Sequence, residues 1–92
     1  MNSIAKITGI ITKLTNIVEL NDGNKVRNLV LCCELHNAQN TLVFHDVLLW
    51  NNLCEIAVKK NMKVAIEGQL KYKNKDGNKY AEIIAAKMEI IQ

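Results

Sequence analysis

Two aromatic residues, Phe44 and Trp50, stand six positions apart in a segment that is otherwise rich in Leu and Val. Alternate side chains of a β-strand point to the same face, so this even spacing places both rings on one side of a strand. A flat ring on an exposed sheet is a surface on which any nucleobase can stack, and each stack contributes about 1–3 kcal/mol. Packing in a core or against a second subunit is the alternative role for the same two rings.

Basic residues are concentrated between residues 59 and 79, where seven lysines accompany two acidic residues, while the rest of the chain carries a small net negative charge. Such a concentration of positive charge indicates an anionic partner, although a solvated lysine-rich surface has the same composition. Tyr72 and Tyr80 flank the last of these lysines, so a ring could stack on a base while ammonium groups meet phosphates. Tyr80 could equally close the core. We predict nucleic-acid contacts from Phe44, Trp50, Tyr72, Arg27, Lys71, Lys73, Lys75, Lys79 and Tyr80.

The sequence contains no pattern typical of a metal centre or an active site. Its three cysteines are an odd number, and two of them, Cys32 and Cys33, are adjacent, which favours reduced thiols over a disulfide framework. The two histidines, His36 and His45, are nine positions apart with no second cysteine pair, so a zinc site is not indicated. Paired carboxylates, a Gly-rich phosphate loop and a nucleophile with its base are also missing from the motifs. We expect no metal, no cofactor and no enzymatic activity.

Length and composition predict one small globular domain over residues 1–92, because 49% of the residues are apolar and 23% are charged. The uncharged apolar stretches are far shorter than the roughly 20 residues of a membrane-spanning helix. The N-terminus also shows no secretion signal. We therefore expect a cytoplasmic protein without membrane contact.

Turn signals divide the chain into strands. Asp-Gly pairs within residues 21–24 and 74–78 predict two tight turns, because Asp and Gly accept the positive φ values of such turns. The segments between the breaks are rich in Ile, Val, Leu and Thr and predict strands over residues 4–14, 25–35, 41–49, 62–72 and 80–91. Whether pairing continues through residues 17–20 stays open. Gly9 lies inside the first predicted strand and indicates a bulge or a sharp bend there, and Gly68 lies inside the fourth.

One helix is predicted over residues 52–60, where Asn52 and Glu55 have the spacing of a capping box. Three strands, one helix and two strands is the element order of the OB-fold, an all-β, five-stranded Greek-key barrel. A closed barrel also protects the edges of strands that are rich in β-branched residues. An open α+β sheet is the alternative.

Three segments in this order, 44–50 (FHDVLLW), 53–57 (LCEIA) and 62–70 (MKVAIEGQL), resemble the bacterial single-stranded DNA-binding protein family. The resemblance extends over about residues 3–91. It implies an OB-fold that forms a dimer or tetramer and binds single strands without reading their sequence, with the lysine-rich hairpin folding over the DNA. It also implies that His45 lies at a subunit contact, where a histidine would make assembly sensitive to pH near about 6.

The sequence departs from this family in three respects. Aromatic residues are scarce, and Asp46 stands between Phe44 and Trp50 where a basic or neutral residue would suit a phosphate better. Typical members also continue into a Gly/Pro/Gln-rich tail with an acidic tip, whereas this sequence ends at Gln92. In this respect it also resembles the tailless primosomal replication proteins.

These observations predict sequence-independent binding of single-stranded DNA in replication, recombination or repair, by a protein of bacterial, phage or mobile-element origin that associates with the nucleoid. RNA is not excluded as the ligand, because stacking and phosphate contacts do not test for the 2′-hydroxyl. The alternative is a protein-interaction OB subunit of a primosome-like assembly, with a replication or helicase partner and weak DNA binding.

Overall fold

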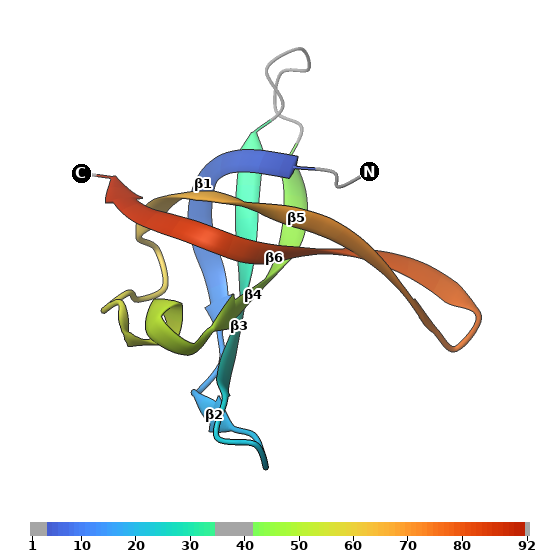
Figure 1. Ribbon diagram of the computed structural model, residues 1–92. Coiled ribbons are helices and arrows are strands. Elements are labelled where there is room, and N and C mark those ends of the chain that lie inside the picture. The colour runs from blue at the N-terminus through green and yellow to red at the C-terminus, as the bar shows by residue number, and fades with distance from the viewer. Residues whose placement is uncertain (1–3, 35–41, 92) are drawn as a thin grey trace.

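The computed structural model describes residues 4–34 and 42–91, and this part of the chain contains six strands and one short 3-10 helix. The elements, shown in Figure 1, are β1 (Ile4–Leu14), β2 (Val18–Glu19), β3 (Lys25–Glu34), β4 (Leu42–Trp50), η1 (Asn51–Glu55), β5 (Lys63–Lys75) and β6 (Asn78–Ile91). All five predicted strands are therefore confirmed, and β2 continues the pairing that the sequence left open. The predicted strand ends at residues 35 and 41, like His36, lie outside the described residues.

The strands close into a ring. Their order in the sheet is β1-β5-β6-β4-β3-β2, and β1 pairs with β3 as well, so five strands surround a common interior and β2 stays outside. β1 makes this closure possible because it pairs with β5 from Ile4 to Ile10 and with β3 from Ile10 to Leu14. All pairs are antiparallel except β4 with β6, which run parallel. This is the predicted OB-fold topology.

The interior of the ring is apolar. On β4 the odd-numbered Val47 and Leu49 are buried, whereas Phe44 and Asp46 on the other face are exposed, as the alternation predicts. Each fully buried aliphatic side chain contributes about 1.5–3 kcal/mol relative to an exposed one. The fully buried side chains are Ile11, Leu29, Leu31, Val47, Leu49, Cys54, Val64, Ile66 and Ile83.

The predicted helix over residues 52–60 is wrong. Only the 3-10 helix η1 forms, without a side-chain cap, and Ile56 directly after it is extended with φ −69° and ψ 125°. The neighbouring Asn51 is bound instead to the β2–β3 turn, since its Oδ1 accepts a hydrogen bond from the backbone N–H of Lys25 (2.9 Å). The chain must then return to the ring, where the backbone N–H of Asn61 donates to the carbonyl of Ile11 (2.7 Å). These contacts hold both ends of the segment, and from Ile56 onward the chain returns to the ring of strands without continuing the helix.

Two glycines lie at points of close strand approach. A bulge between β5 and β6, which the sequence analysis did not predict, falls at Gly68, and a Cβ there would meet the Ile84 carbonyl and the Ala85 Cα, the latter at 2.8 Å. Gly9 lies where β1 leaves β5 for β3, and a Cβ there would meet the Cys32 carbonyl. The β1 bulge itself falls between Ile11 and Lys13.

The β5–β6 hairpin is longer than predicted and extends well beyond the ring (Figure 1). Its pairing continues to Lys75 and Asn78, and the turn has φ 54° at Asp76 and φ 79° at Gly77. Two positive φ values in a two-residue loop are typical of a type I′ turn, which matches the twist of the strands. Across residues 4–34 and 42–91, no helix has the length and apolar character that crossing a membrane requires.

Candidate nucleic-acid interface

The outward side chains of β3 and β4, here called the β3–β4 face, carry the two predicted stacking rings. Phe44 is 61% exposed and stands across from Cys32, which in turn stands across from Ile10 on β1. These three residues form an apolar row over three strands, with Phe44 as its most exposed member. An exposed ring flanked by aliphatic surface suits base stacking, so the structure places Phe44 where the sequence predicts it.

Trp50 lies on the same face at the other end of β4, about 20 Å along the strand from Phe44 at about 3.3 Å per residue. It is half-buried and stands across from Val26, which stands across from Val18 of β2. Trp50 is thus neither fully buried in the core nor as exposed as Phe44, so both roles that the sequence left open for it stay open.

Between the Phe44 and Trp50 side chains, a row of cross-strand neighbours runs around the outside of the sheet, and we call it the charged row. Lys13 and Lys71 stand at its ends, and Asp46 and Glu82 are neighbours in its middle. Glu82 is buried, with 9% exposed, and its Oε2 lies 3.0 Å from Nζ of Lys73. Asp46 is exposed and makes no ion pair or side-chain hydrogen bond with any described residue. The sequence analysis missed Glu82 and this neighbouring carboxylate pair.

The hairpin presents different side chains on its two faces. Lys73 stands across from Tyr80 and Lys71 across from Glu82, so these residues share the face that continues the charged row. Tyr72 stands across from Ala81 on the opposite face of the hairpin, 66% exposed. The side chains of Lys75 and Lys79, which were also predicted contacts, lie outside the described part of the structure.

A groove of about 560 Å³ lies between β4 and the hairpin. It is lined by Asp46, Lys73, Asn74, Asp76 and Tyr80. An adjoining hollow of about 250 Å³ shares Asp46 and Lys73 and extends the groove over β1 and β3. Of the predicted contacts, Lys73 and Tyr80 line this groove. Phe44 lies two residues from Asp46 on the same face of β4, Lys71 stands across from Glu82, and Trp50 lies at the far end of β4.

Arg27 and His45 lie on the other side of their strands. Arg27 stands across from Leu49, and its Nε donates a hydrogen bond to the carbonyl of Thr15 (2.8 Å), which directs it away from the groove. His45 is half-buried across from Leu31, on the side of β4 opposite to Phe44. The structure thus does not bring Arg27 or Tyr72 to the groove.

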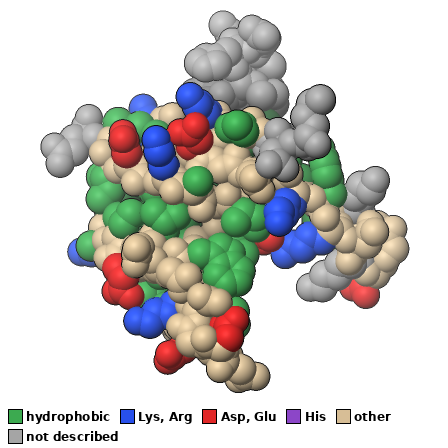
Figure 2. Space-filling view, viewed as in Figure 1, with side chains coloured by type: hydrophobic (Ala, Val, Ile, Leu, Met, Phe, Trp, Pro, Cys, Tyr) green, Lys and Arg blue, Asp and Glu red, His purple; other side chains and the backbone are tan. Residues whose placement is uncertain are grey.

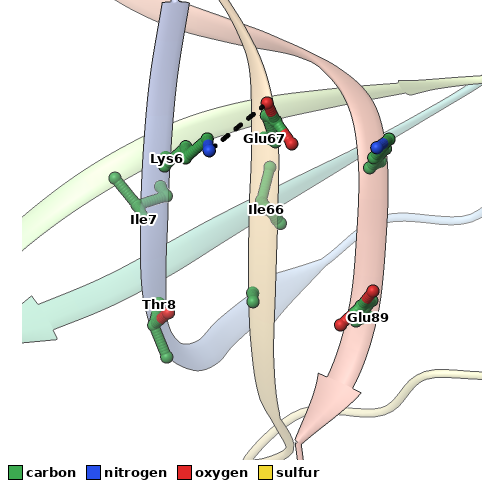
Figure 3. Close-up of a pocket in the computed structure, with 8 residues that line it drawn as sticks. Lys6, Ile7, Thr8, Ile66, Glu67 and Glu89 are labelled. Atoms are coloured by element: carbon green, nitrogen blue, oxygen red, sulfur yellow. Dashed lines mark ion pairs between the residues drawn. The ribbon is translucent and has the colours of Figure 1, made fainter.

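The outward side chains of β1, β5 and β6, the β1–β5–β6 face, differ from the β3–β4 face in charge. A hollow of about 290 Å³ there contains two lysines and two glutamates among its lining residues (Figure 3). Nζ of Lys6 lies 3.9 Å from Oε1 of Glu67, and Lys87 stands across from Glu67 on the next strand. Figure 2 shows acidic and basic side chains interleaved over this region. Such a balanced surface gives a phosphate chain little net attraction.

Two cysteine thiols, the half-buried Cys33 and the buried Cys54, have raised pKa values. Burial, followed by the charge of the adjacent Cys32, raises the pKa of the Cys33 thiol, and burial raises that of Cys54. Within residues 4–34 and 42–91, no group of three or more His, Cys, Asp or Glu side chains could hold a metal ion.

The sequence matches the Single-strand binding protein family over residues 1–91. The chain belongs to this family. Its members are DNA-binding OB-fold proteins rather than enzymes, so the coarse prediction of a non-enzymatic protein that binds single-stranded DNA is confirmed. No curated protein matches the sequence.

Among solved structures, this single-strand binding family member is similar to the N-terminal domain of the PriB protein from Thermoanaerobacter tencongensis, which is described as dimeric. The TM-score is 0.76 at 20% sequence identity, and the match covers 97% of this chain and 96% of that chain. At this identity the likeness shows the fold, and it agrees with the ring of strands described above.

Proposed function

We propose that residues 1–92 act as one domain that holds single-stranded DNA across the β3–β4 face and under the β5–β6 hairpin, without requiring a sequence motif. One observation carries this proposal: the exposed Phe44 ring stands beside a groove whose far wall holds Tyr80 and Lys73. The β3–β4 face and the hairpin thus combine aromatic surface for bases with exposed lysines, Lys13 and Lys71, at the ends of the charged row, and these are the two components of sequence-tolerant binding.

The side chains have separate roles in this proposal. Phe44 and Tyr80 stack on bases from the two sides of the groove, and Trp50 marks the far end of the bound strand. Lys71 and Lys13 meet phosphates at the two ends of the charged row, since both are exposed lysines on the outward surface. Lys73 contributes less, because its ammonium group already lies 3.0 Å from the Glu82 carboxylate.

The proposed assembly is a homodimer. Within the described residues, no strand pairs with the second edge of β1 from Ile4 to Gly9, because its pairing with β3 begins at Ile10. An open strand edge is a template for pairing with a second copy. The dimeric PriB domain, which shares this fold, supports the same assembly.

The binding test uses the fluorescence of the single Trp50, titrated with dT oligonucleotides at low and high salt. We expect quenching, and an affinity whose logarithm falls with log salt by about 0.7 per phosphate contacted. Phe44→Ala should weaken binding by about tenfold or more, because a base stack is lost.

Tyr80→Ala and Tyr72→Ala form a matched pair, since the two tyrosines lie on opposite faces of one hairpin. We expect the Tyr80 variant to lose about tenfold in affinity and the Tyr72 variant to change by less than threefold. A protein that binds no oligonucleotide in this titration would instead be the protein-interaction subunit of a replication assembly, and its partner would then be a protein.

A further inference from the structure

The centre of the proposed DNA-binding face is acidic, although its ends are basic. Asp46 and Glu82 are neighbours on β4 and β6, and Asp76 lines the same groove from the hairpin. Lys73 is the only lysine lining this groove among the described residues, and its charge is balanced by Glu82 at 3.0 Å. Among the described side chains, the carboxylates therefore outnumber the lysines at this groove, and these carboxylates repel a phosphodiester.

From this arrangement we propose that Asp46 reads the edges of the bound bases and gives the protein a preference for bases with an exocyclic amino group, cytosine among the pyrimidines. This inference rests on the proposed function, because it assumes that single-stranded DNA lies over Phe44. Phosphates held at Lys13 and Lys71, at the ends of the charged row, leave the bases directed toward its centre.

The geometry brings a base to the carboxylate. Asp46 lies two residues from Phe44 on the same face of β4, so their Cβ atoms are about 7 Å apart. A base stacked on the Phe44 ring has its edge within reach of the next outward residue. Asp46 has no partner among the described side chains, and its oxygens are available as acceptors at this edge.

The chemistry of the pyrimidine edges then decides the preference. Cytosine offers an N4 amino group, which donates to a carboxylate, whereas thymine presents the O4 acceptor at the same position. The remaining N3–H of thymine lies between two carbonyl oxygens, and these repel a carboxylate. A carboxylate beside the stacking ring therefore favours dC over dT, whereas ring stacking and phosphate contact accept both.

The test measures the affinity of the full chain for dC and dT oligonucleotides of equal length, near pH 8, for the wild type and for Asp46→Ala. Removing the carboxylate should tighten binding to dT, because repulsion from O4 is relieved, and should weaken binding to dC, because the hydrogen bond from N4 is lost. The ratio of the dT to the dC dissociation constant should therefore fall about fivefold. Glu89→Ala removes an exposed carboxylate from the β1–β5–β6 face and should leave the ratio unchanged.

One outcome overturns this inference alone: the ratio of the dT to the dC dissociation constant changes by less than twofold in Asp46→Ala, while both strands still bind with the expected dependence on salt and on Phe44. Absence of binding to either strand overturns the proposed function together with it. Circular dichroism of both variants confirms that the exposed substitutions leave the fold intact.

Discussion

At the scale of single residues, Cys32 and Cys33 are chain neighbours that face opposite sides of β3, and thiol chemistry can distinguish them. Cys32 lies in the apolar row beside Phe44, whereas burial raises the pKa of the Cys33 thiol. At a pH below 9.0, the ordinary pKa of a cysteine thiol, a raised pKa leaves a smaller fraction of Cys33 as the reactive thiolate. Alkylation of Cys33 should therefore be slow and should become faster as the pH rises. We expect a bulky maleimide near pH 7.5 to modify Cys32 first and to abolish DNA binding.

Peptide mass spectrometry over time checks this prediction, with and without a saturating dT oligonucleotide. Bound DNA should slow the labelling of Cys32 several-fold. Cys32→Ser is the control, since it should keep DNA binding after maleimide treatment. Equal labelling rates for Cys32 and Cys33, or labelled protein that binds normally, would contradict the placement of the DNA over this row.

The residues of the site differ in how far the sequence could reveal them. Phe44 and Trp50 follow from strand alternation alone. The side of the hairpin on which each tyrosine lies follows from counting outward from the Asp76-Gly77 turn, and the same count places Glu82 across from Lys71. The neighbouring position of Asp46 and Glu82 does not follow, because the parallel pairing of β4 with β6 joins segments that are distant in sequence.

At the scale of elements, Gly68 and Gly77 are required for different reasons, and alanine substitution separates them. A Cβ at Gly68 would collide with the backbone of Ile84 and Ala85, while nothing lies within 4 Å of a Cβ at Gly77, where φ is +79°. Gly68→Ala should therefore lower the free energy of unfolding by about 3 kcal/mol through overpacking. Gly77→Ala should lower it by about 1 kcal/mol, the cost of the left-handed conformation alone.

Urea unfolding followed by circular dichroism measures both values. The difference between the two variants carries the argument, because each replaces glycine with the same residue. Similar losses for both would mean that β6 shifts to accept a Cβ at Gly68, and that the close approach of β5 and β6 is not fixed.

The elements also show where local pattern fails. Apolar alternation and Asp-Gly turns predict the strands because these signals act within a few residues. The segment after β4 has helical spacing and a plausible cap, but the chain must bury Cys54 and Val58 and then return to Ile11 within a few residues. Tertiary contacts therefore override a weak local preference for helix.

At the scale of the whole molecule, the two faces of the ring of strands differ in the distribution of their aromatic and charged side chains. The β3–β4 face combines exposed rings with an uneven distribution of charge, whereas the β1–β5–β6 face pairs its charges, as Lys6 and Glu67 illustrate. The second, open edge of β1 borders this balanced face. A surface with matched charges and an open strand edge is better suited to a second copy of the chain than to a polyanion.

This division predicts a dimer that leaves both β3–β4 faces accessible. Light scattering should give twice the chain mass of 10.4 kDa, with or without a short dT oligonucleotide, and 1 M salt should leave the mass unchanged if backbone pairing dominates. Hydrogen exchange provides the site-specific measurement, since the amides of residues 4–9 that point to the open edge should be protected at high concentration and exchange on dilution. A mass of 10.4 kDa at all concentrations, or fast exchange of these amides in the dimer, would place the contact elsewhere. A dimer with two accessible β3–β4 faces should also bind long DNA strands more tightly than short ones. A strand that is long enough to reach both faces makes its second contact within the same complex.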